Sequence, residues 1–207
     1  MIADEEGNGF VAFDLEKVLE ECGALTEGHF LLSSGKHSDR YVEKFHLLRK
    51  PAILQQVCRA MIEQLGETKI DVVAGPTTGG ILIAAEIARQ LGVRAAYAER
   101  ADGGGMERAF RRVDYFEPGD RAMVVDDILT TGGSVRETIL ALKPHPVELA
   151  ATMVMVDRSM GRTDLGTPYS ALTEMDVPAW DPAGCPLCAQ GIPAVKPGTT
   201  VQNTGAP

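Results

Sequence analysis

The segment 123–134 combines the residue types best suited to binding a phosphorylated sugar. It begins with apolar residues typical of a buried strand, and two acids, Asp126 and Asp127, follow directly. Hydroxyl residues and glycines come next, in the order Thr130, Thr131, Gly132, Gly133 and Ser134. Glycines let backbone N–H groups approach an anion, hydroxyls add donors, and the N-terminus of a following helix favours negative charge. The two carboxylates are suited to accept hydrogen bonds from ribose hydroxyls, directly or through a hydrated Mg²⁺.

Other interpretations of this segment are weaker. Asp-Asp before Thr-Gly-Gly is also consistent with a simple turn and helix cap, but the ordered set of acids, hydroxyls and glycines favours a ligand site. Neither glycine-rich turn, at residues 75–80 or 130–133, is followed by Lys-Ser or Lys-Thr, which excludes a Walker A loop. No Gly-x-Gly-x-x-Gly opens a helix, which argues against a dinucleotide-binding site.

The elements that must position this segment alternate between strands and helices. Apolar periodicity predicts helices over residues 14–25, 51–65, 81–91 and 134–142, and strands over residues 70–74, 93–98, 122–125 and 147–156. Asp14 is the expected N-cap of the first helix, and Gly92 is the expected stop of the third. Apolar strands separated by helices indicate an α/β fold with a parallel sheet covered on both faces. Residues 126–133 would form a loop beyond the carboxyl end of a strand, where such sheets bind ligands.

The length of 207 residues suits one compact domain with a small appended piece. We expect a single domain over residues 1–196, with about 14–48 and 170–196 forming a hood or extension. Residues 197–207 are expected to be a frayed tail. Residues 99–112 contain three consecutive glycines and four arginines without an apolar period, which predicts a mobile loop.

Charge and composition limit the partners. A net charge of −9 and a pI near 4.9 argue against a general nucleic-acid or anionic-membrane binder, since such partners need a basic footprint. No apolar stretch approaches the roughly 18–20 residues that span a bilayer, and the N-terminus does not resemble a signal peptide. We therefore expect a cytoplasmic protein.

The sequence motifs assign no clear role to the four cysteines or to His29 and His37. Cys22 and Cys58 lie on apolar helix faces and are expected in the core. Cys185 and Cys188 form a Cys-Pro-Leu-Cys pair, which raises a metal or a redox hypothesis. Zinc normally needs four ligands, and no second Cys/His pair stands at zinc-finger spacing, so a metal site is not favoured except across a dimer. His29 and His37 are expected to be structural or solvent-facing.

Residues 124–134 resemble the signature with which type I phosphoribosyltransferases bind phosphoribosyl pyrophosphate (PRPP). Residues 27–38 and 156–158 resemble the orotate branch of that family, and the resemblance extends over roughly residues 15–195. It implies the type I phosphoribosyltransferase fold, with an N-terminal hood and a mobile lid loop. It also implies a Mg²⁺-dependent transfer of the phosphoribosyl group from PRPP to orotate, which gives orotidine 5′-monophosphate and pyrophosphate in pyrimidine synthesis.

The resemblance also assigns roles to individual residues. The ribose hydroxyls would be held by Asp126 and Asp127, and the 5′-phosphate by Thr131, Gly132, Gly133 and Ser134, with Ile128 and Leu129 in the same PRPP loop. The pyrophosphate would be held by Thr77, Thr78 and Gly79, and orotate by Lys36, Thr130 and Arg158. The catalytic set would be Asp126, Asp127 and the lid arginine Arg100. No direct protein ligand to the metal is implied, because Mg²⁺ would be held mainly by PRPP, and a homodimer in which one lid covers the other site is expected.

The lid and the pyrophosphate loop differ from the family pattern, which commonly has lysines in both. Here the lid cations are Arg100, Arg108, Arg111 and Arg112, and Thr77-Thr78-Gly79-Gly80 contains no lysine. Either arginines act in this lid, or the base or the activity differs. The alternatives are therefore a phosphoribosyltransferase for another base, or a non-catalytic regulator of the same fold that senses PRPP or nucleotides, with RNA as a further ligand to test.

Overall fold

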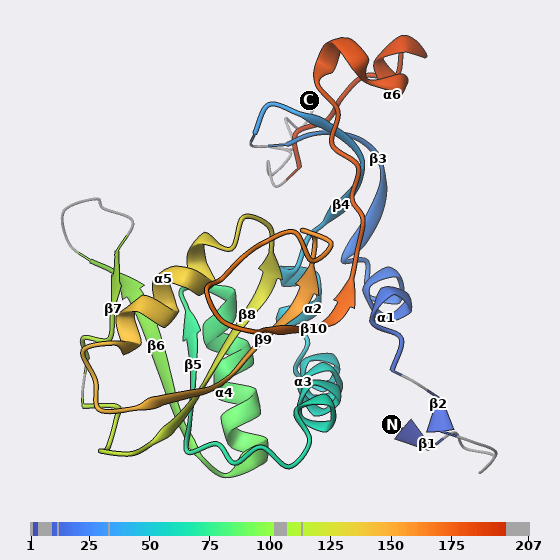
Figure 1. Cartoon of the computed structure of the whole chain (residues 1–207). Coiled ribbons are helices and arrows are strands. Elements are labelled where there is room, and N and C mark those ends of the chain that lie inside the picture. Colours follow the sequence, from blue (N-terminus) through green and yellow to red (C-terminus); the bar gives the residue numbers. More distant parts are fainter. Residues whose placement is uncertain are drawn as a thin grey trace, which may run out of the picture.

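The computed structural model describes residues 2–3, 10–11, 13–32, 34–101, 107–112 and 114–197 and contains a central six-stranded sheet. The strand order is β10-β9-β8-β5-β6-β7 (Figure 1). The strands are β5 (Val72–Pro76), β6 (Arg94–Arg100), β7 (Arg108–Ala109), β8 (Arg121–Leu129), β9 (Glu148–Asp157) and β10 (Ser170–Glu174). All neighbours pair in parallel except β7, which runs antiparallel to β6. The predicted parallel α/β class is confirmed.

Helices cover both faces of this sheet. They are α1 (Leu15–Glu21), α2 (Phe45–Leu48), α3 (Pro51–Leu65), α4 (Gly79–Leu91) and α5 (Gly133–Leu142). Alternate side chains of the buried strands enter two cores: Val73, Met123 and Val125 pack with α1 to α4, whereas Val72 and Val124 pack with α5. This explains why the strands are apolar on both faces. Within the described ranges, no helix is long and apolar enough to cross a membrane.

Local signals in the sequence define several helix ends. The Asp14 carboxylate accepts a hydrogen bond from the Lys17 N–H at 3.1 Å and caps α1, as predicted. Helix α3 starts at Pro51, which suits a first turn, and α4 ends at Gly92, which has a left-handed φ of 69°. The boundaries of the main helices therefore follow from capping chemistry as much as from packing.

The order of the strands reverses between β5 and β8. From β5 the chain moves to β6 on one side, and then returns to place β8 on the other side of β5. The loops after β5 and β8 therefore leave the sheet in opposite directions and flank a crevice at its carboxyl edge. Ligands bind at such switch points in open α/β sheets.

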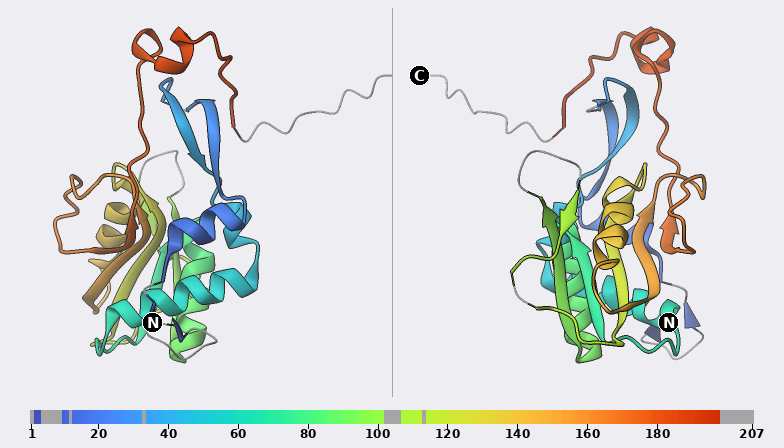
Figure 2. Two further views of the ribbon diagram at one scale, coloured as in Figure 1. Left: turned by 90° about the vertical axis from the view of Figure 1, so that its right-hand side faces the viewer. Right: turned by 60° about the vertical axis from the view of Figure 1, so that its left-hand side comes forward.

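A second antiparallel sheet stands above this edge. It is the hairpin of β3 (Leu25–Leu31) and β4 (His37–Val42) (Figure 1). After β10 the chain rises beside the hairpin, turns at η1 (Pro182–Gly184) and α6 (Pro186–Ala189), and descends along its other side (Figure 2). The N-terminal strands β1 (Ile2–Ala3) and β2 (Phe10–Val11) pair with each other.

Some boundaries differ from the prediction. β8 continues through the two acids to Leu129, so the loop is shorter than residues 126–133. Part of the segment 99–112 is regular, because β6 extends to Arg100 and pairs with β7; residues 102–106 lie outside the described residues. The hairpin segment ends in the short helix α2, and β10 was not predicted. The expected frayed tail lies, apart from Pro197, outside the described residues.

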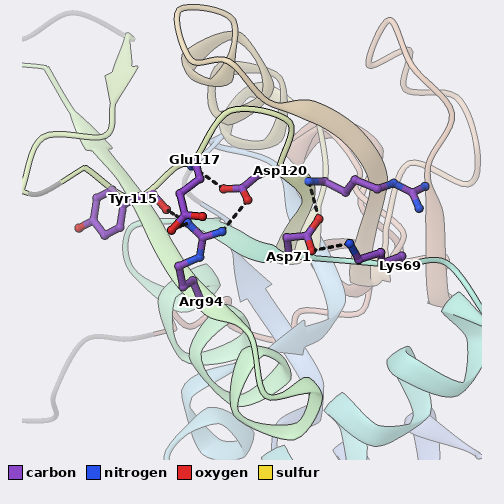
Figure 3. A network of polar contacts seen from close by, with 7 residues as sticks. Lys69, Asp71, Arg94, Tyr115, Glu117 and Asp120 are labelled. Carbon is purple, nitrogen blue, oxygen red and sulfur yellow. Dashed lines mark hydrogen bonds and ion pairs between the residues drawn. The ribbon is translucent and has the colours of Figure 1, made fainter.

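A polar network fastens the opposite, amino-terminal edge of the sheet (Figure 3). The Arg94 guanidinium lies 2.5 Å from Asp120 Oδ1 and also pairs with Glu117, while Asp120 Oδ2 accepts the Glu117 N–H at 2.7 Å. Nearby, Asp71 pairs with Lys69 at 3.2 Å and accepts the N–H of the first residue of β8 at 3.0 Å. These contacts join the starts of β5, β6 and β8 and lie away from the crevice.

Candidate active site

The loop from β8 to α5 encloses a small polar cavity at the carboxyl edge of the sheet. The cavity has a volume of about 150 Å³ and is lined by Arg100, Asp126, Glu137 and residues 128–135. Gly132 begins the turn into α5 with a left-handed φ of 74°, and a Cβ there would come within 2.6 Å of Thr163. The turn therefore requires glycine, and it directs the backbone N–H groups at the start of α5 toward the cavity region.

Asp126 lies in this cavity wall and is almost fully buried, with 6% of its surface exposed. Its Oδ1 accepts the Asp127 N–H at 2.8 Å. Burial, followed by the neighbouring charge of Asp127, raises the pKa of Asp126 to about 7. A bound cation or a set of hydroxyl donors would stabilise the ionised form of this carboxyl group.

Asp127 faces a different neighbour. Its Oδ2 forms an ion pair with Lys44 Nζ at 2.7 Å, and its Oδ1 accepts the Ile128 N–H at 2.6 Å. Lys44, between β4 and α2, was not among the predicted site residues. The sequence signal was a lysine directly after the hairpin, but only the fold brings it beside an acid more than eighty positions away.

The loop from β5 to α4 packs tightly against the two acids. A Cβ at Gly79 would lie 1.7 Å from Asp127 Oδ2, and one at Gly75 would lie 2.2 Å from the Gly80 carbonyl. Both positions therefore require glycine because of close approach. The Thr77–Thr78 peptide bond is cis, and the Thr78 side chain is exposed. The structure thus brings the predicted residues 77–79 next to the predicted acids, across the crevice between β5 and β8.

The arginines of the expected lid occupy different environments. Arg100 lines the cavity beside Asp126. Arg108 is buried, and its guanidinium donates to Thr77 Oγ1 at 3.0 Å and to Glu137 Oε2 at 3.2 Å. Arg112 pairs with Glu99 at 3.0 Å on the surface. Arg108 therefore connects the loop after β5 to helix α5, a role that the sequence did not indicate.

A larger cavity lies on the other side of the β8–α5 loop. It has a volume of about 510 Å³ and is lined by Leu31, Leu32, Ser34, Tyr41, Thr130, Thr131, Arg158, Ala179, Lys196 and Pro197. Burial lowers the pKa of Arg158, and its Nε is buried without a hydrogen-bond partner among the described residues. An unpaired buried guanidinium N–H is a ready donor for an anionic or carbonyl ligand.

Asp157 holds the segment that bears Arg158. Its carboxylate accepts the N–H groups of Ser159 at 2.6 Å and Gly161 at 3.1 Å, and the Tyr169 hydroxyl at 2.8 Å. Burial raises the pKa of Asp157, but these hydrogen bonds outweigh burial and the net shift is downward. Asp157 is therefore a charged anchor for the turn after β9, and it was not singled out from the sequence.

Of the three predicted orotate-binding residues, Thr130 and Arg158 line the larger cavity and Lys36 does not. It lies on the turn between β3 and β4, and its Nζ is 4.0 Å from Asp181 Oδ1. Ser34 on the same turn does line the larger cavity, while Ser33 lies outside the described residues. The direction of the hairpin turn determines this placement, and sequence spacing cannot reveal it.

Thr130 and Thr131 line both cavities and join them into one continuous site. The small polar cavity suits a phosphate at a helix N-terminus, and the larger one suits a planar ring beside an arginine. The arrangement can therefore hold a phosphorylated sugar at the loop, with a ring on one side and a second anionic group near α4 on the other.

Comparisons with known proteins agree with this geometry. The phosphoribosyl transferase domain family matches residues 46–183 of the chain. Orotate phosphoribosyltransferases from Thermotoga petrophila and Caldicellulosiruptor bescii are each 42% identical to it, over 89% and 88% of this chain and 97% and 95% of theirs. A crystal structure of orotate phosphoribosyltransferase from Aeropyrum pernix is similar, with a TM-score of 0.67 and 29% identity, over 78% of this chain and 94% of that one.

Proposed function

Because this chain belongs to the phosphoribosyltransferase family and is 42% identical to orotate phosphoribosyltransferases over most of its length, we propose that it transfers the phosphoribosyl group of PRPP to orotate. The products are orotidine 5′-monophosphate and pyrophosphate. The observation that carries this proposal is the junction of the two cavities at Thr130 and Thr131, since a glycosidic bond must form between a base site and a ribose phosphate site.

The 5′-phosphate binds at the β8–α5 loop. Thr131, Ser134 and the backbone of Gly132 and Gly133 supply its donors, and the positive end of α5 favours the dianion. The ribose hydroxyls donate to Asp126 and Asp127, which holds the sugar at the end of β8. Ile128 and Leu129 form the wall of the same cavity.

The pyrophosphate group binds at Thr77, Thr78 and Gly79, at the start of α4. Arg100 and Lys44 supply the nearby cations that the loop itself lacks. As the bond between the anomeric carbon and the pyrophosphate oxygen breaks, negative charge builds on the leaving group. Fixed donors around it stabilise that charge most in the transition state.

Orotate binds in the larger cavity. Arg158 donates to its carboxylate or carbonyl oxygens, and Thr130 contacts its ring. The ring nitrogen attacks the anomeric carbon as pyrophosphate leaves. We assign Lys36 to closure of the hairpin turn over the base, because it lies on the same turn as Ser34, which lines the larger cavity, while its Nζ lies 4.0 Å from Asp181 Oδ1.

The donor set fits magnesium held mainly by PRPP. Asp126 offers a buried carboxylate near the place of the ribose hydroxyls, its pKa of about 7 would fall beside a hydrated cation, and hard oxygen donors suit this metal. Magnesium, when bound with PRPP, supplies charge neutralisation to the pyrophosphate. The enzyme acts as a homodimer in the cytoplasm, in keeping with the family resemblance, and the acidic net charge of −9 favours small anions bound at defined sites over nucleic acid.

Loss of orotate absorbance tests the proposal directly. Purified protein should consume orotate only when PRPP and Mg²⁺ are both present, with other bases substituted as controls. Pyrophosphate release with another base, but not with orotate, would retain the PRPP site and reject the base assignment. If no base were consumed and no pyrophosphate were released with any of them, a non-catalytic regulator would be favoured.

A further inference from the structure

Two histidines of the hairpin and two cysteines of the C-terminal segment converge on one point. His29 lies on β3 and His37 on β4, whereas Cys185 directly precedes α6 and Cys188 lies within it. One ligand atom from each lies within 4.8 Å of all the others. Both histidines and Cys185 are buried, and Cys188 closes the cluster from the exposed side. The elements that carry the cluster, β3, β4 and α6, stand above the central sheet in Figure 1.

The backbone around the cluster is held at two points. His37 and Trp180 exchange both backbone hydrogen bonds at 2.8 Å. Farther along, the Val195 N–H donates to the His29 carbonyl at 2.8 Å, and the Leu31 N–H donates to the Val195 carbonyl at 2.9 Å. The cysteines lie on the turn between these two attachments. Their position against the histidines is therefore defined by the backbone on both sides.

The spacing between the ligand atoms suits a small tetrahedral ion. Zinc, with Zn–S bonds of about 2.3 Å and Zn–N bonds of about 2.0–2.1 Å, holds neighbouring ligand atoms about 3.3–3.8 Å apart. Cys185 Sγ is 3.4 Å and Cys188 Sγ 3.8 Å from His29 Nε2, and Cys188 Sγ is 3.2 Å from His37 Nδ1. The two ring nitrogens are 2.8 Å apart, so a metal between them would require the rings to separate slightly.

The tautomer of His29 also suits a ligand. His29 Nδ1 lies 2.6 Å from the Ile192 carbonyl oxygen. A carbonyl only accepts, so Nδ1 carries the proton, and in the neutral ring Nε2 presents its lone pair to the cluster. Metal-binding histidines are usually oriented by such a hydrogen bond from the other ring nitrogen. The Ile192 carbonyl comes from the same C-terminal segment as the cysteines.

We propose that His29, His37, Cys185 and Cys188 bind one Zn²⁺. Two thiolates and two imidazoles in tetrahedral arrangement select zinc among the abundant divalent ions. Four protein ligands leave no open position for water or substrate, so the site is structural. The sequence contains no second Cys/His pair at zinc-finger spacing, and the fold supplies that pair from the hairpin, about 150 residues earlier in the chain.

The zinc site fastens the C-terminal segment over the active site. Ala179 and Lys196, which precede and follow the cysteine turn, line the larger cavity together with Leu31 and Ser34 of the hairpin. The metal would therefore fix the C-terminal segment and the hairpin, which form two walls of that cavity, relative to each other. A two-stranded sheet has little hydrophobic core of its own, and a structural metal would stabilise it.

Metal content of the full-length protein tests the site. Protein purified without chelator should contain one zinc per chain by elemental analysis, and the Cys185→Ser, Cys188→Ser double variant and His37→Asn should each lose it. Cys22→Ala and Cys58→Ala are matched controls in the core and should keep it. Stoichiometric zinc in the double variant would overturn the proposal, as would reduced wild-type protein that takes up no zinc.

Cobalt substitution covers the case in which a variant fails to fold. Wild-type protein stripped of metal and titrated with Co²⁺ should show the visible bands of a tetrahedral ion together with thiolate charge-transfer absorption, saturating at one equivalent. Zinc should displace this spectrum. An octahedral spectrum, or one without thiolate bands, would reject these ligands. These readouts are independent of catalysis. In limited proteolysis, residues 177–197 should in addition be cleaved faster after zinc removal, while the rate of cleavage within the central sheet should not change.

Discussion

Asp126 and Asp127 are adjacent in the chain but differ in their surroundings. Asp126 is buried in the cavity wall, where its Oδ1 accepts the Asp127 N–H, whereas Asp127 is paired with Lys44. Neighbouring side chains of a strand point to opposite faces, which separates the two carboxylates. One carboxyl group therefore titrates near neutrality and responds to ligand binding, and the other keeps a fixed counter-ion.

The first prediction concerns pH. The pKa of Asp126 is raised to about 7, so in the free protein its proton is lost as pH rises through 7. The ionised form accepts ribose hydroxyls, so kcat/KM for PRPP should rise with pH across this range and then level off. The same shift means that the stability contributed by the neutral carboxyl group is present at low pH and lost as pH rises through 7.

Initial rates at limiting PRPP across neutral pH measure this profile, with Asp126→Asn as the comparison. PRPP itself titrates, but that effect persists in the variant. A variant that retains the full rise would show that Asp126 is not its source.

The second prediction concerns Lys44. Lys44→Met removes a cation that lies beside Asp127 and close to the proposed position of the leaving pyrophosphate. The substitution should raise KM for PRPP by about 10-fold or more, since a charged hydrogen-bond partner is lost. Lys17→Met, an exposed lysine paired with Glu21, is the matched control and should change nothing. Unchanged PRPP kinetics in Lys44→Met would remove this residue from the site.

The third prediction separates the base from PRPP. Arg158→Ala should raise KM for orotate by about 10- to 100-fold through loss of charged hydrogen bonds, and should affect KM for PRPP much less. Arg162→Ala, at an exposed arginine four residues later, should behave as wild type. Steady-state kinetics with each substrate varied in turn provide the measurement, and equal effects on both KM values would contradict the assignment.

At the scale of elements, the two edges of the sheet differ in role, because one carries the candidate site and the other stabilises the fold. The carboxyl edge bears the loops after β5, β8 and β9, and the Arg158 Nε there is buried without a hydrogen-bond partner among the described residues. The amino edge bears the network of Arg94, Asp120 and Asp71, in which the carboxylates have basic or backbone partners (Figure 3). Polar groups with partners stabilise the fold, whereas those without are available to a ligand.

The fourth prediction follows from this division. Asp120→Ala removes the partner of Arg94 and the acceptor of the Glu117 N–H, and should cost about 1–3 kcal/mol of stability. For a chain of this size, that lowers Tm by roughly 2–10 °C. KM for PRPP and orotate should stay at wild-type values. Asp114→Ala, an exposed acid nearby, is the control, and thermal unfolding by circular dichroism is the readout.

At the scale of the whole molecule, the candidate site is assembled from three parts of the chain. The sheet supplies the loops, the hairpin supplies Tyr41 and Lys44, and the C-terminal segment supplies Lys196. An exposed Leu140 and the apolar side chains of Phe110 and Ala141 line a further cavity of about 490 Å³ beside α5 and β7. We propose this surface, beside β7, as a contact of the proposed dimer.

The fifth prediction concerns assembly. Light scattering after gel filtration should give about twice the chain mass of 22.2 kDa. If each lid completes the partner site, specific activity should fall on dilution as the dimer dissociates. A species of one chain mass with full activity at every concentration would contradict the dimer and leave the site map intact.

The sequence was sufficient for features that depend on local chemistry. Periodicity indicated the main helices and strands, Asp14 and Gly92 marked helix ends, and the acid, hydroxyl and glycine order of residues 126–134 indicated a polar loop, which lines the small cavity. These signals are local because capping, turn geometry and burial of one face act over a few residues. The parallel sheet follows from them, since strands joined by helices pair in only a few ways.

Only the tertiary structure decided which distant residues meet. Lys44 reaches Asp127, Arg108 turns inward to Thr77, and Lys36 stays outside the cavity. The cluster of two histidines and two cysteines is the clearest case, because neither pair alone has the ligands of a metal site. Such contacts depend on the direction in which a hairpin and a returning chain leave the sheet, and that direction is set by packing over the whole chain.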